Sequence, residues 1–311
     1  MAYLYRRSFA FCPLRTRCPR HHRRPTNPHR WAPKCNGCNH TMNRITTAFA
    51  DAKESGHPAL LPFLCAGSPQ IDSLPKLLPA MQAAGAAVVE IGFPYSDPVA
   101  DGPTIAAAMH IALEEGITPE IIFEQVRSVR DDLTIGLVAM VSVSIVIALG
   151  GPASFTKQAA DAGFDGCIFP DLPLGESDAY LKACKANGLS MILLISPTTP
   201  DDRAVEIANA STGFAYLIAR SGITGESNDV PDISERVRNI RKRSSTPIAC
   251  GFGISTPEHV GKIVQYADGA IVGSALVRRL INAHKANQDY VVEAELAVTE
   301  LATGLISMDQ F

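Results

Sequence analysis

Short apolar runs alternate with longer segments of mixed polarity along most of the chain. Leu74, Leu77, Leu78 and Met81 recur at helical spacing between two such runs, although Pro79 falls inside the pattern and should kink or shorten that helix. Eight apolar runs that alternate with helix-like segments over roughly 250 residues predict a (β/α)8 TIM barrel, with a doubly wound open sheet as the second choice. No change of composition among these segments indicates a second domain. The predicted strands are Leu60–Cys65, Ala87–Phe93, Thr134–Val141, Gly166–Phe169, Met191–Ile195, Phe214–Ala219, Ile248–Cys250 and Ala270–Val272.

The stretch from Leu133 to Phe155 contains no charged residue and is long enough to cross a bilayer. Thr134, Ser142 and Ser144 interrupt it, and Gly150-Gly151-Pro152 breaks it. Its content of Val and Ile suits a buried parallel strand, and a membrane span here would divide a regular repeat. We therefore expect a soluble protein with no membrane segment.

The first 41 residues differ from the rest of the chain in charge. They contain nine Lys or Arg residues and no acidic residue, whereas the remaining 270 residues carry 19 basic and 31 acidic side chains. A body with this acidic excess repels polyanions, so we expect no nucleic-acid partner, and a small anionic substrate needs a local site built from backbone groups. We interpret residues 1–41 as a disordered basic extension, arising from a mis-assigned start codon or, alternatively, as a plastid transit segment. Residues 42–311 then form the barrel domain.

The eight cysteines divide evenly between the basic segment and the body. Cys35 and Cys38 have the spacing of a zinc-ligand pair, but an isolated pair in an Arg- and Pro-rich tract is a weak signal, so we predict no metal site. Cys65, Cys167 and Cys250 fall in apolar runs, where a free cysteine behaves as a small core residue. The body lacks a disulfide-scaffold pattern, which indicates a reducing, cytoplasmic compartment.

Two acidic residues stand at the second predicted strand and the loop after it. Glu90 lies between Val89 and Ile91 inside the apolar run, and Asp101 lies in the Gly- and Pro-rich loop that follows. A carboxyl that points into a barrel is desolvated, which raises its pKa and makes it a proton donor near neutral pH. Asp101, in a polar loop, should be more solvated and remain ionised. We interpret the two as an acid–base pair, the alternatives being a surface Glu at a strand edge and an Asp that caps the helix beginning near Pro103.

Glycine-rich segments follow the sixth, seventh and eighth predicted strands. Arg220–Gly225 is a short polar loop whose two glycines let backbone N–H groups turn toward one anion. Gly251-Phe-Gly253 precedes a helix that Ser255 or Thr256 can cap, and Gly273-Ser274 follows the eighth strand. Glycines after strands seven and eight, beside helix N-termini, form the recurrent phosphate site of such barrels. The residues alone therefore predict a phosphate-bearing small substrate and Glu/Asp acid–base chemistry, without naming the reaction.

The segment from Glu90 to Thr104, Glu-Ile-Gly-Phe-Pro-Tyr-Ser-Asp-Pro-Val-Ala-Asp-Gly-Pro-Thr, closely resembles the signature of the tryptophan synthase alpha subunit family. The resemblance spans roughly Met42 to Leu280, with the motifs in family order. It implies a barrel fold, cytoplasmic tryptophan biosynthesis, and a lyase that splits indole-3-glycerol phosphate into indole and glyceraldehyde 3-phosphate. It also implies no cofactor on this subunit and a partner, the pyridoxal-phosphate-dependent beta subunit, in an alpha2-beta2 heterotetramer. The further motifs are Leu61-Pro-Phe-Leu-Cys-Ala-Gly67, Phe169-Pro-Asp-Leu-Pro173, Arg220-Ser-Gly-Ile-Thr-Gly225, Gly251-Phe-Gly-Ile-Ser-Thr-Pro-Glu258 and Gly273-Ser-Ala275.

The resemblance also implies roles for individual residues. Glu90 is similar to the family's catalytic acid/base, which protonates carbon 3 of the indole ring and later accepts the proton of the glycerol hydroxyl. Asp101 is similar to its partner, which accepts a hydrogen bond from the indole N–H while positive charge develops on the ring. Tyr95–Pro98 resemble the loop that faces the beta subunit. The positions that resemble the substrate pocket are Phe63, Tyr216, Thr224 and Phe252, and those that resemble the phosphate site are Gly225, Gly253, Gly273 and Ser274.

Two segments depart from the family pattern. Val141–Val146 stand where the family usually has a Tyr and an Asn after the third strand, which concerns partner contact more than chemistry. Cys65 stands where the family usually has Thr. Two other functions remain open: a free-standing indole-releasing lyase without a beta partner, and a non-catalytic subunit that only activates its partner. The presence of Glu90 and Asp101 argues against the non-catalytic subunit. Copurification with a beta subunit would distinguish the alpha subunit from the free-standing lyase.

Overall fold

A computed structural model describes residues 43–98, 101–219, 232–251 and 253–306 of the chain. The basic segment 1–41 lies outside these residues, as do the predicted site residues Thr224, Gly225 and Phe252. The described strands are all parallel and form a sheet in the order β5-β4-β3-β2-β1-β9-β8-β7-β6. The strands are β1 Ala59–Cys65, β2 Val88–Gly92, β3 Gly136–Met140, β4 Gly166–Ile168, β5 Ser190–Ile192, β6 Leu194–Ile195, β7 Ala215–Ile218, β8 Ile248–Gly251 and β9 Gly269–Val272.

The two ends of this sheet, β5 and β6, are neighbours along the chain and are separated only by Leu193. The Leu193 N–H donates to the Ser211 hydroxyl (3.2 Å), whereas its carbonyl accepts from the Tyr216 N–H (3.0 Å). The predicted fifth strand, Met191–Ile195, is therefore one strand divided into two halves, and it joins both edges of the sheet. The predicted (β/α)8 barrel is confirmed, and the open sheet was the wrong alternative.

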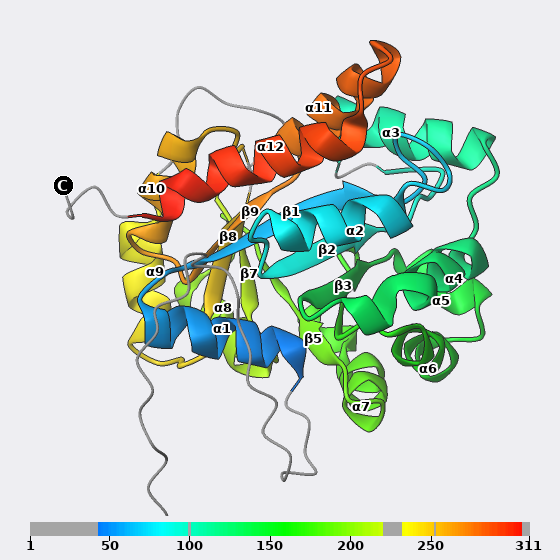
Figure 1. Ribbon diagram of the computed structural model, residues 1–311. Coiled ribbons are helices and arrows are strands. Elements are labelled where there is room, and N and C mark those ends of the chain that lie inside the picture. The colour runs from blue at the N-terminus through cyan, green and yellow to red at the C-terminus, as the bar shows by residue number, and fades with distance from the viewer. Residues whose placement is uncertain (1–42, 99–100, 220–231, 252, 307–311) are drawn as a thin grey trace, which may run out of the picture. The chain divides into compact units, whose positions relative to one another are not determined.

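A helix follows every strand except β5, which β6 succeeds directly, and the helices surround the barrel (Figure 1). Threonine caps begin two of them, since Thr118 accepts from the Ile121 N–H (3.4 Å) and Thr256 from the His259 N–H (3.3 Å), each followed by proline in the first turn. The α-helices are α1 Arg44–Ser55, α2 Leu74–Ala83, α3 Pro103–Glu114, α4 Pro119–Val129, α5 Val143–Ala148, α6 Pro152–Ala162, α7 Asp178–Ala186, α8 Asp201–Ala210, α9 Ser234–Arg241, α10 Pro257–Val264, α11 Ser274–Lys285 and α12 Tyr290–Ala302. Short 3-10 helices occupy η1 Arg130–Asp132, η2 Leu174–Glu176 and η3 Thr303–Leu305.

The structure also shows what becomes of Pro79 and of the uncharged stretch from Leu133 to Phe155. Helix α2 continues for four residues beyond Pro79, so the proline does not shorten it. The uncharged stretch Leu133–Phe155 contains β3, the short helix α5 and the start of α6. No helix within the described ranges is long and apolar enough to span a membrane.

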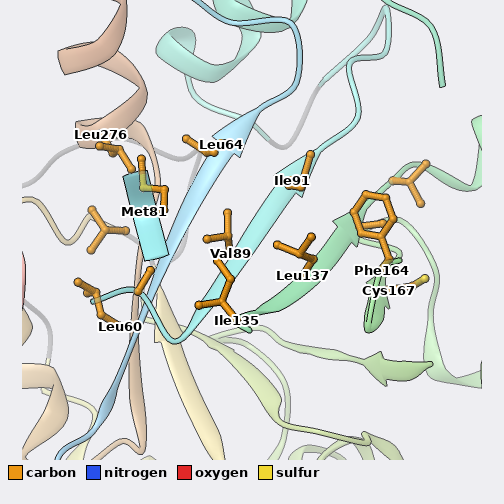
Figure 2. Packing of buried hydrophobic residues seen from close by; sticks show 14 of the residues in the cluster. Leu60, Leu64, Met81, Val89, Ile91, Ile135, Leu137, Phe164, Cys167 and Leu276 are labelled. Carbon is orange, nitrogen blue, oxygen red and sulfur yellow. The ribbon is translucent and has the colours of Figure 1, made fainter. Parts of the chain in front are cut away.

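The outward-facing side chains of the strands form the larger apolar core, between the barrel and its helices. Leu60 of β1, Val89 of β2 and Leu137 of β3 belong to it and are at most 1% exposed. Figure 2 shows these three residues in one cluster with Met81 of α2 and Leu276 of α11. Because successive side chains of a strand point to opposite faces, the residues between these positions face the barrel interior.

Helix α1 closes the N-terminal end of the barrel interior. Its Ile45 and Phe49 are buried in one apolar cluster with inward-facing residues such as Leu61 of β1 and Val88 of β2. The strands approach α1 closely because several begin with glycine. A Cβ atom on Gly166, for example, would lie 2.7 Å from the Ile45 Cδ1 atom, closer than packed carbon atoms approach.

A buried carboxylate links α1 to the same end of the barrel. The carboxylate of Asp165, which directly precedes β4, accepts from the Leu137 N–H (2.9 Å), from Arg130 (3.2 Å) and from Arg44 (3.2 Å). Asp165 and Arg130 have side-chain exposures of only 7% and 8%. Burial raises the pKa of Asp165, while Arg130, the Leu137 N–H and Arg44 oppose that rise. Both oxygens of this buried carboxylate are thus partnered.

Candidate active site

Glu90 lies in the barrel interior. Val89 and Ile91 belong to the outer core, so the alternation along β2 turns Glu90 inward together with Val88 and Gly92. The residue is 0% exposed, and neither carboxyl oxygen has a hydrogen-bond partner among the described residues. Burial raises the pKa of Glu90 to about 8. The carboxyl is therefore mainly protonated at neutral pH, and the alternative of a surface Glu at a strand edge was wrong.

Phe63 of β1 stands next to Glu90, since the two are register partners across β1 and β2. Its ring extends toward the C-terminal end of β2, where a Cβ on Gly92 would lie 2.5 Å from the Phe63 Cζ atom. Gly92 therefore leaves room for the aromatic ring, which forms one wall beside the acid. Phe63 belongs to a small apolar cluster at this end of the barrel, together with Cys65, Ile105, Ala108, Met109 and Val277.

Tyr216 of β7 also faces the interior. Its ring extends to β8, because a Cβ on Gly251 would collide with the Tyr216 hydroxyl. Burial raises the pKa of this hydroxyl well above its ordinary value, and the negative charges of Glu90 and, more weakly, Asp101 add to the rise. This electrostatic interaction places Tyr216 in the same environment as both predicted catalytic carboxyls.

Asp101 lies in the loop between β2 and α3, and its backbone N–H closes a turn by donating to the Pro98 carbonyl (3.1 Å). Its carboxyl group interacts electrostatically with the Tyr95 hydroxyl. The residue at the N-cap of α3 is Gly102, so the interpretation of Asp101 as the helix cap was wrong. Burial raises the pKa of Asp101 to about 6, and the Tyr95 hydroxyl opposes that rise. Asp101 is thus less solvated than the sequence suggests, yet it remains mainly ionised at neutral pH.

Two of the glycine positions lie where strands end and helices begin. Gly273 is the N-cap of α11 and Ser274 is its first residue, so the N–H groups of the first turn point out of the helix at the end of β9. A Cβ on Gly273 would lie 3.6 Å from the Phe63 Cβ atom, which places this helix start beside the aromatic wall. Gly253 follows β8 with φ 77°, a left-handed backbone conformation that favours glycine.

Sequence reasoning missed two features of this region. One is the electrostatic interaction of the Tyr95 hydroxyl with Asp101, because Tyr95 was assigned only to a partner-facing loop. The other is the contribution of α3 and α11 to the apolar wall, through Ile105, Met109 and Val277. The alternation of Leu61, Phe63 and Cys65 along β1 could have indicated that Cys65 also faces inward. Within the described residues, no group of three or more His, Cys, Asp or Glu side chains could hold a metal ion.

The segment that departs from the family pattern, Val141–Val146, forms the end of the third βα junction. Ser142 caps α5, accepting from the Ser144 N–H (3.2 Å). The Asp171 carboxylate accepts from the Ser142 hydroxyl (2.8 Å) and from the Val143 N–H (3.0 Å). The same helix carries Ile147, which is 65% exposed.

Comparison with known proteins agrees with this arrangement. The family described as "Tryptophan synthase alpha chain" matches residues 49–305. The tryptophan synthase alpha chain of Prochlorococcus marinus (strain NATL2A) is 41% identical over 241 residues, covering 77% of this chain and 89% of that protein. The alpha chain of Synechococcus sp. (strain CC9902) is 40% identical over 259 residues, covering 83% and 95%.

Solved structures give the same result. The crystal structure of the tryptophan synthase alpha chain from Legionella pneumophila subsp. pneumophila aligns with a TM-score of 0.77 and 30% identity, covering 85% of this chain and 98% of that one. A chain of tryptophan synthase from M. tuberculosis, in the aminoacrylate-bound form, aligns with a TM-score of 0.74 and 29% identity, covering 85% and 100%. On this similarity in sequence and structure, the chain belongs to the tryptophan synthase alpha chain family.

Proposed function

We propose that this chain cleaves indole-3-glycerol phosphate into indole and glyceraldehyde 3-phosphate, with Glu90 as the acid and base and Asp101 as the charge-stabilising partner. Membership of the family makes the chain a lyase of tryptophan biosynthesis. The observation that carries the assignment of roles is the carboxyl of Glu90, which is fully buried inside the barrel, without a hydrogen-bond partner among the described residues, and beside Phe63.

The reaction breaks the bond between carbon 3 of the indole ring and the glycerol chain. Protonation of carbon 3 makes the ring electron-poor, so that it can accept the electron pair of the breaking bond. Glu90, with its pKa raised to about 8, holds a proton at neutral pH and can donate it. The resulting carboxylate then takes the proton of the glycerol hydroxyl next to the breaking bond. That carbon becomes the aldehyde of glyceraldehyde 3-phosphate, and Glu90 returns to its protonated state.

Asp101 has a different task, since it needs only to remain charged. The ring gains positive charge after protonation, and an ionised carboxylate that accepts the indole N–H stabilises that charge. A pKa of about 6 leaves Asp101 mainly ionised at neutral pH. The two raised pKa values predict that kcat/KM falls below about pH 6, where Asp101 gains a proton, and above about pH 8, where Glu90 loses one.

The phosphate of the substrate would bind at the start of α11, where Gly273 and Ser274 present backbone N–H groups close to Phe63. Gly253 and Gly225 complete this phosphate site in our proposal, and Thr224, Phe252 and Tyr216 line the pocket for the rest of the substrate. Gly273→Asp should raise KM for the substrate by at least about 100-fold, because a carboxylate would stand where the phosphate binds. Steady-state kinetics test this.

The fold should survive that change, because the added Cβ meets Phe63 only at ordinary contact distance. Gly175→Asp is the matched control, since it adds the same charge where a Cβ has no neighbour within 4 Å. An unchanged KM in a folded Gly273→Asp protein would remove the phosphate site from this helix.

The remaining proposals follow from the family. We propose that the chain itself carries no cofactor in this reaction. We also propose that it assembles with a pyridoxal-phosphate-dependent beta subunit into an alpha2-beta2 heterotetramer, with Tyr95–Pro98 facing the partner, and that it acts in the cytoplasm.

The test is indole release from indole-3-glycerol phosphate by the purified chain, with and without the beta subunit. We expect release in both cases and a higher rate after assembly. Elution of the two chains as separate species at micromolar concentration, with no activation, would favour a free-standing lyase. Absence of indole in both cases would overturn the proposed function.

A further inference from the structure

We propose that Gly92 is a positioning residue for the reaction: without a Cβ atom it lets the Phe63 ring lie against β2, which keeps the space beside Glu90 open for the indole ring. The inference rests on the proposed function, in which Phe63 and Glu90 adjoin the bound substrate. It gives a residue without a side chain a part in selecting an aromatic substrate.

The Phe63 ring crosses from its own strand to the neighbouring one. Phe63 and Glu90 are register partners across β1 and β2, and Gly92 is the next inward-facing position along β2. A Cβ atom on Gly92 would lie 2.5 Å from the Phe63 Cζ atom and 2.7 Å from its Cε2 atom. The tip of the ring therefore occupies the volume that a side chain at position 92 would need, just beyond Glu90 toward the C-terminal end of the strand.

The backbone at Gly92 is held from both sides. Its carbonyl accepts from the Ala66 N–H (3.0 Å), and the N–H of the next residue, Phe93, donates to the Met140 carbonyl (2.9 Å). Phe93 is also anchored in the outer core, where it is 1% exposed. The strand is thus not free to move away from a methyl group at position 92, so the Phe63 ring has to move instead.

The size of that movement follows from the contact distance. Carbon atoms pack at about 3.5 to 4.0 Å, so a Cβ atom at 2.5 Å would displace the tip of the ring by at least about 1 Å. The ring belongs to a packed cluster with Ile105 and Met109 of α3 and Val277 of α11, which are at most 3% exposed. This packing leaves the barrel interior as the direction of movement, and there the ring would take space from the indole ring.

The base of the same side chain adjoins the proposed phosphate site. A Cβ atom on Gly273 would lie 3.6 Å from the Phe63 Cβ atom, which the backbone of β1 holds in place. A methyl group at position 92 should therefore disturb the aromatic end of the pocket and spare the phosphate end. This difference separates positioning of the substrate from a general loss of packing, which would not discriminate between the two ends.

Gly92→Ala tests the inference, because it adds only the missing Cβ atom. Misplacement of the ring by about 1 Å should lower kcat/KM by about 100-fold. A rise of at least about 10-fold in KM should contribute to this loss, because the indole ring loses part of its space. Inhibition by indole should weaken by a similar factor, whereas inhibition by glyceraldehyde 3-phosphate should not change. A purely structural role would lower the melting temperature and leave KM in place.

Gly166→Ala is the matched control at the opposite end of the barrel. A Cβ atom on Gly166 would lie 2.7 Å from the Ile45 Cδ1 atom, so this change also adds one methyl group against a buried side chain. Both variants should lower the melting temperature by about 2 to 10 °C, because each overpacks the barrel interior. Only Gly92→Ala should raise KM and weaken inhibition by indole.

A second variant checks that the effect passes through Phe63. Leucine lacks the atoms at the tip of the ring, so in a Phe63→Leu background Gly92→Ala should change kcat/KM by less than about 3-fold. Phe63→Leu lowers activity by itself, since Phe63 lines the pocket, and only the difference between the two backgrounds is compared. An unchanged KM in folded Gly92→Ala, or an equal loss in both backgrounds, would overturn the inference.

Binding of the two products gives a readout that needs no turnover. Calorimetry with indole and with glyceraldehyde 3-phosphate should show weaker binding of indole alone in Gly92→Ala. This result would support the role of Gly92 even if the wild type released no indole, which would be a failure of the proposed function alone. Equal binding of indole by the wild type and Gly92→Ala would overturn the inference in either case.

Discussion

Asp165 and Glu90 are both buried carboxyl groups of the same barrel, near opposite ends of its strands and in opposite surroundings. Asp165, at the N-terminal end, accepts from a backbone N–H and from two arginines. Glu90, toward the C-terminal end, has no hydrogen-bond partner among the described residues. A carboxyl satisfied in this way anchors structure, whereas an unsatisfied one costs stability and is available to react.

The packing at the two ends of the barrel differs in the same way as the two carboxyl groups do. At the N-terminal end, Ile45 and Phe49 of α1 fill the interior against strands that begin with glycine. At the C-terminal end, Gly92 makes room for the Phe63 ring, and Gly273 leaves the start of α11 open beside it. The first arrangement stabilises the barrel and the second leaves space for a substrate, as expected where βα loops emerge.

The largest expected effect is on catalysis by Glu90→Gln. Glutamine keeps the shape of the side chain but cannot transfer the proton, so turnover should fall by about 10⁴-fold. Binding of a non-cleavable phosphate analogue should be retained, because the phosphate site is untouched. Single-turnover indole release measures the first quantity and calorimetry the second.

The same variant should be more stable than the wild type in alkaline solution. The folded pKa of Glu90, about 8, lies above its ordinary value of 4.5. The stability linked to its protonated form is therefore complete below about pH 4.5 and is lost as the pH rises through 8. Glu90→Gln abolishes this loss, which amounts to at most about 4 kcal/mol at pH 8. Urea unfolding of both proteins at pH 6 and pH 9 measures this loss. An equal change in the free energy of unfolding between the two pH values in both proteins would contradict the prediction.

Asp165→Asn should show the opposite behaviour. It leaves the buried Arg130 without its counter-charge, so the free energy of unfolding should fall by about 3 kcal/mol. The kcat of the folded protein should stay near that of the wild type. Denaturant unfolding measures the first quantity and kinetics at low temperature the second.

Asp161→Asn is the control for that change, since it removes an exposed partner of Lys157 on α6. Its effect on stability should be close to zero. A large loss of kcat in folded Asp165→Asn, with stability intact, would mean that the two ends of the barrel do not divide their tasks.

Asp101→Asn should have a smaller effect on catalysis than Glu90→Gln. It keeps a hydrogen-bond acceptor but loses the charge that stabilises the cationic ring, which typically costs about 100-fold in rate. Residual indole release should therefore exceed that of Glu90→Gln in the same single-turnover assay. The reverse order of the two residual activities would move the proton-transfer role away from Glu90.

Much of the barrel could be predicted because its signal is local. The apolar runs located every strand to within a few residues, and they placed Glu90 inside β2. The division of the fifth strand at Leu193 could not be predicted, because it depends on a bond to Ser211, 18 residues away in the chain. The closure of the barrel by α1 likewise depends on Ile45 meeting Gly166 of β4, which no local pattern encodes.

The site shows the same limit. Residue type and strand position led to Glu90 and Gly273, and the family resemblance led to Phe63; the roles of all three stay predictions. The surroundings of Asp101 were predicted less well: the sequence suggested a solvated carboxylate, whereas burial raises its pKa, and a loop has no periodicity from which that burial could be predicted. The roles of Thr224, Gly225 and Phe252 remain predictions.

The protonation state of Glu90 is the most direct test of this account. Infrared difference spectra between the wild type and Glu90→Gln isolate the carboxyl C=O band of that one residue and can be recorded across pH. We predict a band that is present at neutral pH and disappears with a midpoint near pH 8, because burial without partners keeps the carboxyl neutral. Loss of the band near pH 4.5, the ordinary value for a solvated glutamate, would contradict it.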